Sequence, residues 1–438
     1  MQGAEALALR YSPMILQGQQ DVAAAAARIK RSDAGSFPSV SATLFGSRSS
    51  WSNILSTPDA TPPVNFMGIP PGNFLDQNIT AMLPIYTGGR VAAASRAAQA
   101  DQAASASDLD TTLQDVVLQT RISYRKVIYE RSLLGAQEQN LAAAQEQLRT
   151  EELRYEAGKN PAYTVYRART QVANAQQDQT NAYRDWRKAH FDLDTVLGIS
   201  LASNIALSDG LERLPPAPAP NTVSPLQSSQ MPFGGAELQP LLDAAIANRP
   251  ELRAAQQRTE SASARVVRAR AAYRPQINLM GMGDLTRGGA GTRNGLNYTL
   301  GFAAGVPIFE GGALSAAEHE AAAALRKAQA AEGAELLQVN SDVGAAWLNR
   351  AAARQNLTTM QTGLQQAQED YVVQQLRYSA GKGIQLDLLN ALAALTKARV
   401  GLEQARFEHS VAQDQLRRAT GTLAPPSPKI YLTPGPSP

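Results

Sequence analysis

Cysteine is absent from the 438 residues of the chain. Its absence excludes disulfide bonds, thiolate metal sites, cysteine nucleophiles and, in the sequence as given, a lipid-modified cysteine. Aromatic residues make up only 6% of the chain, whereas alanine and glutamine recur throughout. This composition is typical of long helices that pack closely through small side chains rather than of a bulky globular core.

Long hydrophobic runs are also missing. No stretch of about 18 apolar residues occurs, so the sequence predicts no transmembrane helix. Met1 leads into Glu5 without a long apolar stretch, and we therefore expect no secretory signal peptide in the sequence as given. The 41 basic and 38 acidic residues are interspersed and give a net charge of +3. Without a basic stripe or an acidic tail, the sequence predicts no nucleic-acid partner.

Catalytic and metal-binding patterns are scarce. His190, His319 and His409 are the three histidines, and each is isolated in a helical stretch. His319 lacks the second histidine of a zinc-binding HExxH helix, and neither AGK sequence has the earlier glycine of a phosphate-binding loop. We therefore predict that the chain is not an enzyme and has no catalytic, cofactor or metal site.

The chain contains two copies of one unit. Residues 83–89 (LPIYTGG) match 306–312 (VPIFEGG), and residues 153–159 (LRYEAGK) match 376–382 (LRYSAGK). Proline, tyrosine, glycine and lysine stay in register between these motifs, and chance similarity between alanine-rich helices does not produce that. We infer a duplication, with the order helix, strand, strand, long helix, helix in each copy.

The first repeat is expected at residues 1–209. It contains strands at about 39–45 and 78–85 and a helical hairpin at 88–198. A linker, rich in proline, serine and glycine, is expected at 210–235, where it would form an equatorial segment.

The second repeat is expected at residues 236–421. It contains strands at about 277–285 and 297–308 and a helical hairpin at 311–421. A tail rich in proline and serine follows at 422–438 and is expected to be disordered or accessory.

A long helix is predicted in each copy, because no strong helix breaker occurs before Gly158 in the first copy or Gly381 in the second. About 65–70 residues at 1.5 Å each make a rod of roughly 100 Å. Leucine and tyrosine recur every seven residues, which is typical of helices packed side by side in a coiled coil. These residues are Leu134, Leu141, Leu148 and Tyr155, and Leu357, Leu364, Tyr371 and Tyr378.

The four predicted strands alternate between apolar residues and small or polar residues. In the last strand Tyr298, Leu300 and Phe302 face one way, and Thr299 and Gly301 face the other. This pattern is typical of membrane β-barrel strands, but it also fits a half-buried soluble sheet. No other apolar segment is available to cover the strands, which favours the membrane.

Four strands cannot close into a barrel, and an open sheet edge in lipid leaves backbone groups without hydrogen bonds. The chain must therefore take strands from copies of itself. Two copies give eight strands, whose interior is filled by side chains, whereas three give twelve strands and room for a pore. The small inward residues favour three copies.

Over about residues 5–421 the chain resembles the TolC/OprM family of outer-membrane efflux proteins. The resemblance is carried by the PIYTGGR and PIFEGGA junctions, the two LRYxAGK turns and the Arg-Pro-Glu-Leu run at 249–252. It implies a mixed, mainly α fold with β structure. A trimeric, 12-stranded outer-membrane β-barrel would be continued by a periplasmic α-helical barrel. It also implies that the protein lies in the outer membrane of a Gram-negative-type bacterium and that a large part of it extends into the periplasm.

The resemblance implies the channel subunit of a tripartite efflux or type I secretion system. Its partners would be two further copies, outer-membrane lipid, a periplasmic adaptor (membrane fusion protein) and an inner-membrane transporter. No cofactor is implied, and the cargo stays open. The alternative is a soluble or periplasmic coiled-coil adaptor or scaffold, for which the alternating segments would have to form a soluble β-domain.

In the family, the turns of the helical hairpins form a periplasmic tip that contacts the adaptor. By motif position, the tip residues here are Arg154, Gly158, Lys159, Arg377, Gly381 and Lys382. A simpler interpretation is that each glycine ends its helix in the left-handed conformation and that each lysine is solvated.

The resemblance also implies a gate at the periplasmic entrance. Asp387 matches a position whose carboxylate narrows the entrance, and Tyr378 matches one that latches neighbouring helices. Three copies of Asp387 would form an acidic ring that favours cations. Asn390 and Thr164 stand where acidic residues can occur, and Gly383 stands where a latching arginine can occur, so we expect a less tightly held closed state. Alternatively, Asp387 only caps or decorates the return helix.

Overall fold

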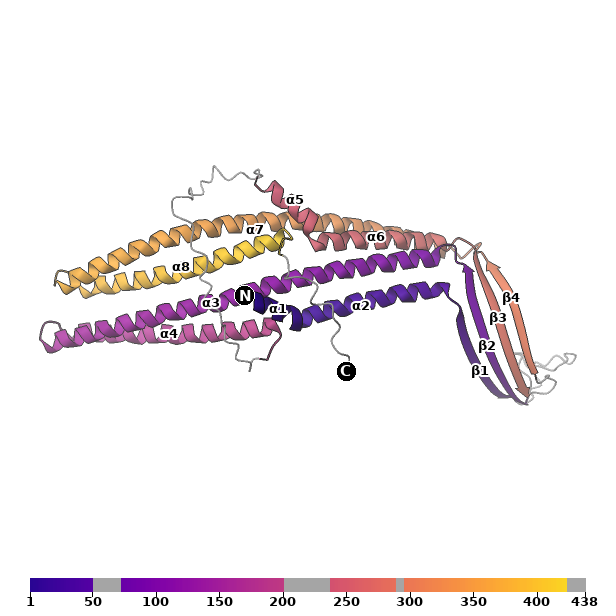
Figure 1. Cartoon of the computed structure of the whole chain (residues 1–438), viewed down its shortest axis with the longest axis horizontal. Coiled ribbons are helices and arrows are strands. Elements are labelled where there is room, and N and C mark those ends of the chain that lie inside the picture. The colour runs from indigo at the N-terminus through magenta and orange to yellow at the C-terminus, as the bar shows by residue number, and fades with distance from the viewer. Residues whose placement is uncertain (50–71, 201–236, 289–294, 424–438) are drawn as a thin grey trace. The chain divides into compact units, whose positions relative to one another are not determined.

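The computed structural model describes residues 1–49, 72–200, 237–288 and 295–423 (Figure 1). Each copy of the repeat contributes helices, two strands, a long helix and a return helix. The elements are α1 Gln2–Tyr11, α2 Pro13–Asp33, η1 Ala34–Ser36, β1 Ser39–Ser49, β2 Gly72–Tyr86, α3 Arg90–Glu156, α4 Ala162–Leu197, α5 Gln239–Asn248, α6 Pro250–Ala271, β3 Gln276–Gly288, β4 Gly295–Gly305, α7 Ala313–Ser379 and α8 Gln385–Ala419. The described part of the chain is therefore mainly helical, with one antiparallel sheet.

Two compact units make up the chain, and each takes segments from both repeats. The helical unit comprises residues 1–20, 107–253 and 334–438, and the sheet unit comprises 21–106 and 254–333. The expected linker and nearly all of the expected tail lie outside the described residues. No helix in the described part of the chain has both the length and the apolar character needed to cross a membrane.

All four predicted strands are confirmed, in the order β1-β2-β3-β4 with antiparallel neighbours (Figure 1). Their ends differ from the prediction. β1 and β2 are longer, because their pairing continues to Ser49 and Gly72. β4 ends at Gly305 rather than at 308, because its partner β3 begins at Gln276, directly opposite Gly305. The residues after Gly305 have no strand beside them within the described chain.

The two faces of the sheet differ as the alternation predicts. On one face Tyr298, Leu300 and Phe302 are 86%, 75% and 78% exposed. On the other face the Thr80 hydroxyl donates a hydrogen bond to Asn78 Oδ1 at 2.7 Å. The sheet therefore presents a broad apolar surface that the described residues leave uncovered.

Small side chains set the packing of the helical unit. Along α4, Ala168, Ala175, Ala182 and Ala189 are all buried at seven-residue spacing. Alanine at every seventh position lets the facing helix approach closely, as in coiled-coil packing. Larger side chains fill three clusters, which include Val117, Val127 and Leu193; Leu252, Val339 and Val343; and Leu357 and Leu402.

The predicted heptad of the long helices is confirmed in part. Leu357 and Tyr378 of α7 are buried, whereas Leu364 and Tyr371 are half-buried. In the first copy Leu134, Leu141 and Leu148 are only half-buried, and Tyr155 is 49% exposed. Tyr155 lies in the last turn of α3, where the seam between the helices ends.

Candidate functional site at the ends of the helical hairpins

Both helical hairpins reverse direction through the same backbone turn. In the first turn Gly158 has a φ of +68°, and the Lys159 N–H donates to the Arg154 carbonyl at 2.8 Å. The turn at Gly381 repeats this pattern with a φ of +71°. A methyl group added to either glycine would meet no atom within 4 Å. The backbone conformation therefore requires glycine here, and alanine would cost about 1–2 kcal/mol.

A buried carboxylate ties the two hairpins together near these turns. Glu151 of α3 is 0% exposed, and the Tyr378 hydroxyl of α7 donates a hydrogen bond to its Oε1. The side-chain amides of Gln147 and Asn160 donate to the same carboxylate, each at 2.7 Å. Three donors compensate the burial of this charge, which would otherwise be costly.

Tyr378 is held as a proton donor. Burial raises the pKa of its hydroxyl, and the hydrogen bond to Glu151 and the negative charge of that carboxylate raise it further. The phenol is therefore neutral at physiological pH and keeps its proton for Glu151. The guanidinium carbon of Arg154 lies 4.4 Å from the centroid of the Tyr378 ring, in the position of a cation–π contact.

A second contact joins the return helices. The side-chain amide of Gln385, at the start of α8, donates to the backbone carbonyl of Thr164 in α4 at 3.1 Å. Both residues are buried. The Thr164 hydroxyl donates to the Pro161 carbonyl at 2.9 Å, at the first turn of its own helix. The hairpins are thus linked through both their outgoing and their returning helices.

The structure separates the residues predicted from the sequence into two groups. Tyr378 and Thr164 are buried in the two contacts between the hairpins, and Arg154 is half-buried against the Tyr378 ring. Asp387 and Asn390 are exposed on α8. Asp387 lies in the first turn of α8, but Ile384 occupies the N-cap position without a side-chain hydrogen bond, so the interpretation of Asp387 as the cap is wrong. The remaining predicted tip residues, Gly158, Lys159, Arg377, Gly381 and Lys382, are all exposed.

Sequence reasoning missed Glu151, Asn160 and Gln385. A signal for Glu151 was present, because it lies three residues after Leu148 of the heptad, where a coiled coil places its second apolar residue. A charged residue at such a position needs a buried partner. Asn160 and Gln385 lie in or beside turns, where no periodic pattern marks them.

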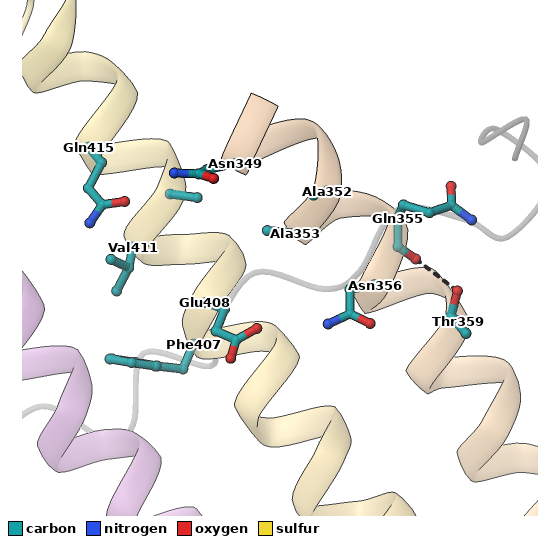
Figure 2. Close-up of a pocket in the computed structure, with 11 residues that line it drawn as sticks. Asn349, Ala352, Ala353, Gln355, Asn356, Thr359, Phe407, Glu408, Val411 and Gln415 are labelled. Carbon is teal, nitrogen blue, oxygen red and sulfur yellow. Dashed lines mark hydrogen bonds between the residues drawn. The ribbon is translucent and has the colours of Figure 1, made fainter. Parts of the chain in front are cut away.

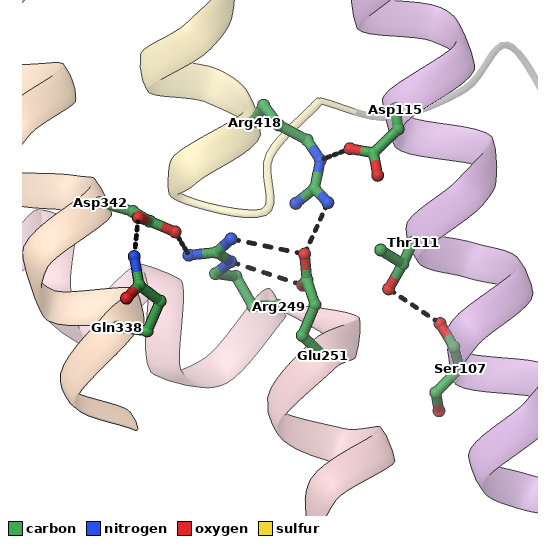
Figure 3. Close-up of polar contacts among 8 residues, drawn as sticks. All are labelled: Ser107, Thr111, Asp115, Arg249, Glu251, Gln338, Asp342 and Arg418. Carbon is green, nitrogen blue, oxygen red and sulfur yellow. Dashed lines mark hydrogen bonds and ion pairs between the residues drawn. The ribbon is translucent and has the colours of Figure 1, made fainter. Parts of the chain in front are cut away.

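A second polar cluster joins the end of α8 to α3 and to the α5–α6 junction (Figure 3). Arg418 donates to Asp115 at 2.6 Å and to Glu251 at 2.5 Å, and Arg249 donates to Asp342 at 3.0 Å. Burial by itself would raise the pKa of Glu251, but its hydrogen bonds and the charges of Arg418 and Arg249 outweigh burial and lower it. These bonds hold α3, α7 and α8 to the α5–α6 junction, at the end of α8 opposite to its turn.

Asp414 of α8 is at the centre of a further buried cluster of ion pairs. Its carboxylate is 1% exposed and lies 3.0 Å from Arg125 and 3.3 Å from Arg121. Arg121 also pairs with Glu5 of α1 at 2.8 Å. Removal of one partner from such a buried cluster typically costs several kcal/mol. The cluster anchors α1, α3 and α8 to one another.

A hollow of about 540 Å³ lies between α7 and α8 (Figure 2). Amides and small side chains dominate its lining, which consists of Asn349, Ala352, Ala353, Gln355, Asn356, Thr359, Phe407, Glu408, Val411, Ala412 and Gln415. Glu408 is the one carboxylate in this lining, and the Thr359 hydroxyl is bonded to the Gln355 carbonyl of its own helix. The lining offers no paired nucleophile and base.

Comparisons with known proteins point to one family. The model of the outer membrane efflux protein family matches residues 6–199 and 241–422. The chain is 26% identical over 331 residues to the outer membrane efflux protein BepC of Brucella suis, covering 75% of this chain and 68% of BepC. It is 32% identical over 197 residues to the protein CyaE of Bordetella pertussis, covering 44% of this chain and 41% of CyaE.

The fold is similar to that of a solved outer membrane channel. The CmeC outer membrane channel of Campylobacter jejuni superimposes with a TM-score of 0.78 at 17% sequence identity. The superposition covers 96% of this chain and 85% of CmeC. At this identity the similarity concerns the fold alone.

Proposed function

The chain belongs to the outer membrane efflux protein family, and from this membership we propose that three copies assemble into a passive exit duct through the outer membrane. Members of the family are transport proteins of the outer membrane rather than enzymes. The duct would serve a tripartite efflux or type I secretion system. The family match favours the channel over the soluble coiled-coil adaptor or scaffold that the helices alone would also fit.

The observation that carries the proposal is the sheet. One face is apolar and uncovered, and β1 and β4 each pair with a single strand among the described residues. An open edge is not tolerated in lipid, so the edges must be closed by other copies. Three copies supply twelve strands, enough for a barrel with an open interior. Its polar face, with Asn78, Thr80 and Thr299, would line the lumen.

The helical hairpins α3–α4 and α7–α8 of three copies would then form a periplasmic helical barrel that continues the β-barrel. This assignment is supported by the unbroken course of α3 and α7, which have 67 residues each. Tight packing through alanine, as seen along α4, suits a ring of neighbouring helices. Two hairpins per copy would give the ring six similar units.

We assign the periplasmic gate to the hairpin ends. Tyr378 and Thr164 would hold the two hairpins of one copy together, through Glu151 and Gln385. Asp387 and Asn390 are exposed and therefore free to face the axis or a neighbouring copy. Three Asp387 carboxylates around the axis would favour cations at the entrance.

The tips would contact a periplasmic adaptor that links the duct to an inner-membrane transporter. Exposure of both turns supports this assignment, and it leaves Lys159 and Lys382 available for acidic or carbonyl groups of a partner. Arg377, Gly158 and Gly381 would complete the contact surface. Arg154 would act indirectly, because it lies against Tyr378.

Native mass spectrometry of the detergent-solubilised protein tests this proposal. We expect a complex of three chains of 46.7 kDa each. A co-expressed adaptor should stay attached to it, and should be lost when Lys159→Glu and Lys382→Glu are combined, while the trimer persists. Monomers that are stable without detergent would contradict the proposal.

A further inference from the structure

The two hairpins of the sheet correspond residue by residue. Residues 83–89 match 306–312, which relates β2 to β4. Pro38 and Pro275 stand directly before the two outgoing strands, which relates β1 to β3. In sequence, therefore, β1–β2 and β3–β4 are two versions of one hairpin.

The pairing of the strands agrees with this correspondence without any shift. In the first hairpin Ser39 lies opposite Met82, and in the second Gln276 lies opposite Gly305. Ser39 and Gln276 each follow the corresponding proline, and Met82 and Gly305 each precede the matched segment. Because the register of a β-hairpin is specified by its side-chain pattern and turn, this agreement shows that duplication preserved strand pairing as well as sequence.

Within the chain, the first hairpin pairs with the second along one boundary between strands, which we call a seam. It runs between β2 and β3 and pairs Asn78 with Asp284 and Ala81 with Gly281. In an assembly of several copies a second kind of seam is needed, between β4 of one copy and β1 of the next. β4 corresponds to β2, and β1 corresponds to β3.

We propose that β4 of one copy pairs with β1 of a second copy in the register of the β2–β3 seam. This inference rests on the proposed trimer and specifies how its copies join. Gly301 of β4 is the counterpart of Asn78, and Ser47 of β1 is the counterpart of Asp284. Because Asn78 lies opposite Asp284, the same register places Gly301 opposite Ser47 of the next copy. It places Ala304 opposite Leu44 and Val306 opposite Ala42.

The proposed register keeps the apolar surface continuous. Within the chain, Val40 lies opposite Ala81, Ala81 opposite Gly281, and Gly281 opposite Leu300, so Val40 and Leu300 share a face. Leu44 lies on this face too, since it is four residues from Val40 on the same strand. Ala304, the proposed partner of Leu44, is on the same face. A shift of the β4–β1 register by one residue would instead bring polar side chains of β1 to the apolar face.

Exposed residues after β4 gain a partner in this register. Val306, Ile308 and Phe309 are 52%, 97% and 87% exposed, although the corresponding residues 83–86 belong to β2. The difference is that residues 83–86 have β3 beside them. In the assembly, β1 of the next copy would take this place, and Phe309 would lie opposite Val40 after an irregularity like the one between Pro84 and Tyr86.

The junction between strand and helix supports the same assignment. Arg274 of the second repeat donates to the carbonyl of Gly88 in the first repeat at 3.1 Å, and a methyl group on Gly88 would lie 2.7 Å from the Arg274 Cβ. At the corresponding glycine of the second repeat, Gly311, no atom of the described residues lies within 4 Å of such a methyl group. The residue that corresponds to Arg274 is Phe37, which is 65% exposed. Phe37 of the next copy would cover Gly311.

Disulfide cross-linking tests the register, and the cysteine-free chain gives it no background. Residues directly opposite in an antiparallel pair have Cα atoms about 4.5–5.5 Å apart, within disulfide range, whereas diagonal neighbours are about 7–8 Å apart. Ala304→Cys is combined with Leu44→Cys, and the controls combine it with Ala42→Cys or Gly46→Cys. Gly301→Cys with Ser47→Cys is a second test pair. Opposite residues in an antiparallel ladder alternate between hydrogen-bonded and non-hydrogen-bonded pairs, and the two test pairs are of different kinds.

We expect covalent dimers and trimers on non-reducing gels for at least one test pair, with roughly tenfold less in both controls. The bond must join two copies, because β1 and β4 of one chain are about 14 Å apart across two intervening strands. Stronger cross-linking in a control would overturn the register but leave the trimer standing. Intact trimers without any cross-link would do the same. A monomeric native mass in detergent for every variant, with the disulfides reduced, would contradict the proposed function itself.

Discussion

Replacement of Leu300 with arginine is expected to abolish the folded assembly in the outer membrane. Leu300 is 75% exposed on the apolar face of the sheet, which in the proposed barrel faces the lipid. An arginine on the lipid face costs about 2–4 kcal/mol per copy near the bilayer midplane. Three copies together would lose roughly 6–12 kcal/mol, which is comparable to the whole stability of many folded proteins.

The matched control for Leu300→Arg is Thr299→Arg. Thr299 is the neighbouring residue, it is also exposed, and it lies on the opposite face of the sheet. In the proposed barrel this face lines the water-filled lumen, where a charge keeps its hydration. We expect trimers in the outer-membrane fraction for Thr299→Arg and none for Leu300→Arg, as seen on gels of unheated samples. Equal loss in both variants would contradict the assignment of the faces.

Replacement of Tyr378 with phenylalanine is expected to loosen the hairpin ends and to increase conductance. The substitution removes only the hydroxyl that donates to the buried Glu151 carboxylate. Loss of a hydrogen bond to a charged group costs about 1.5–3 kcal/mol. If the bond exists only in the closed state, its loss shifts the equilibrium toward the open state by roughly 10- to 150-fold.

Tyr155→Phe provides the control, because Tyr155 is the counterpart of Tyr378 in the first repeat and is 49% exposed. We expect its open probability in planar bilayers to equal that of the unmodified protein, while that of Tyr378→Phe rises. Both variants should keep their trimeric mass. An unchanged open probability in Tyr378→Phe would remove this hydrogen bond from the gate.

Much of the fold could be predicted from the sequence, because duplication and alternation are local patterns. The period of two in residues 297–308 identified a strand, and the absence of strong helix breakers before Gly158 and Gly381 identified the long helices. The end of β4 could not be predicted. Val306 continues the alternation, but the strand ends at Gly305 in the lone chain, because a strand needs a neighbouring strand to pair with. The periodicity of a sequence does not show where such a neighbour ends.

The candidate site was less accessible to sequence reasoning. Tyr378 and Thr164 were found through motif positions in the family, but the partner of Tyr378 was not. Glu151 lies 227 residues before Tyr378 in the chain, and a single sequence carries no signal for so distant a contact. Tyr155 shows the same limit, because its motif equals that of Tyr378 while its exposure differs.

The central claim, that three copies of this chain enclose one water-filled pore, is tested most directly by single-channel recording. The purified protein is added to a planar bilayer at limiting concentration, and current is recorded at fixed voltage. The account predicts stepwise current increases of uniform size, one for each inserted trimer. A silent bilayer, under conditions in which trimers are shown to have inserted, would contradict it.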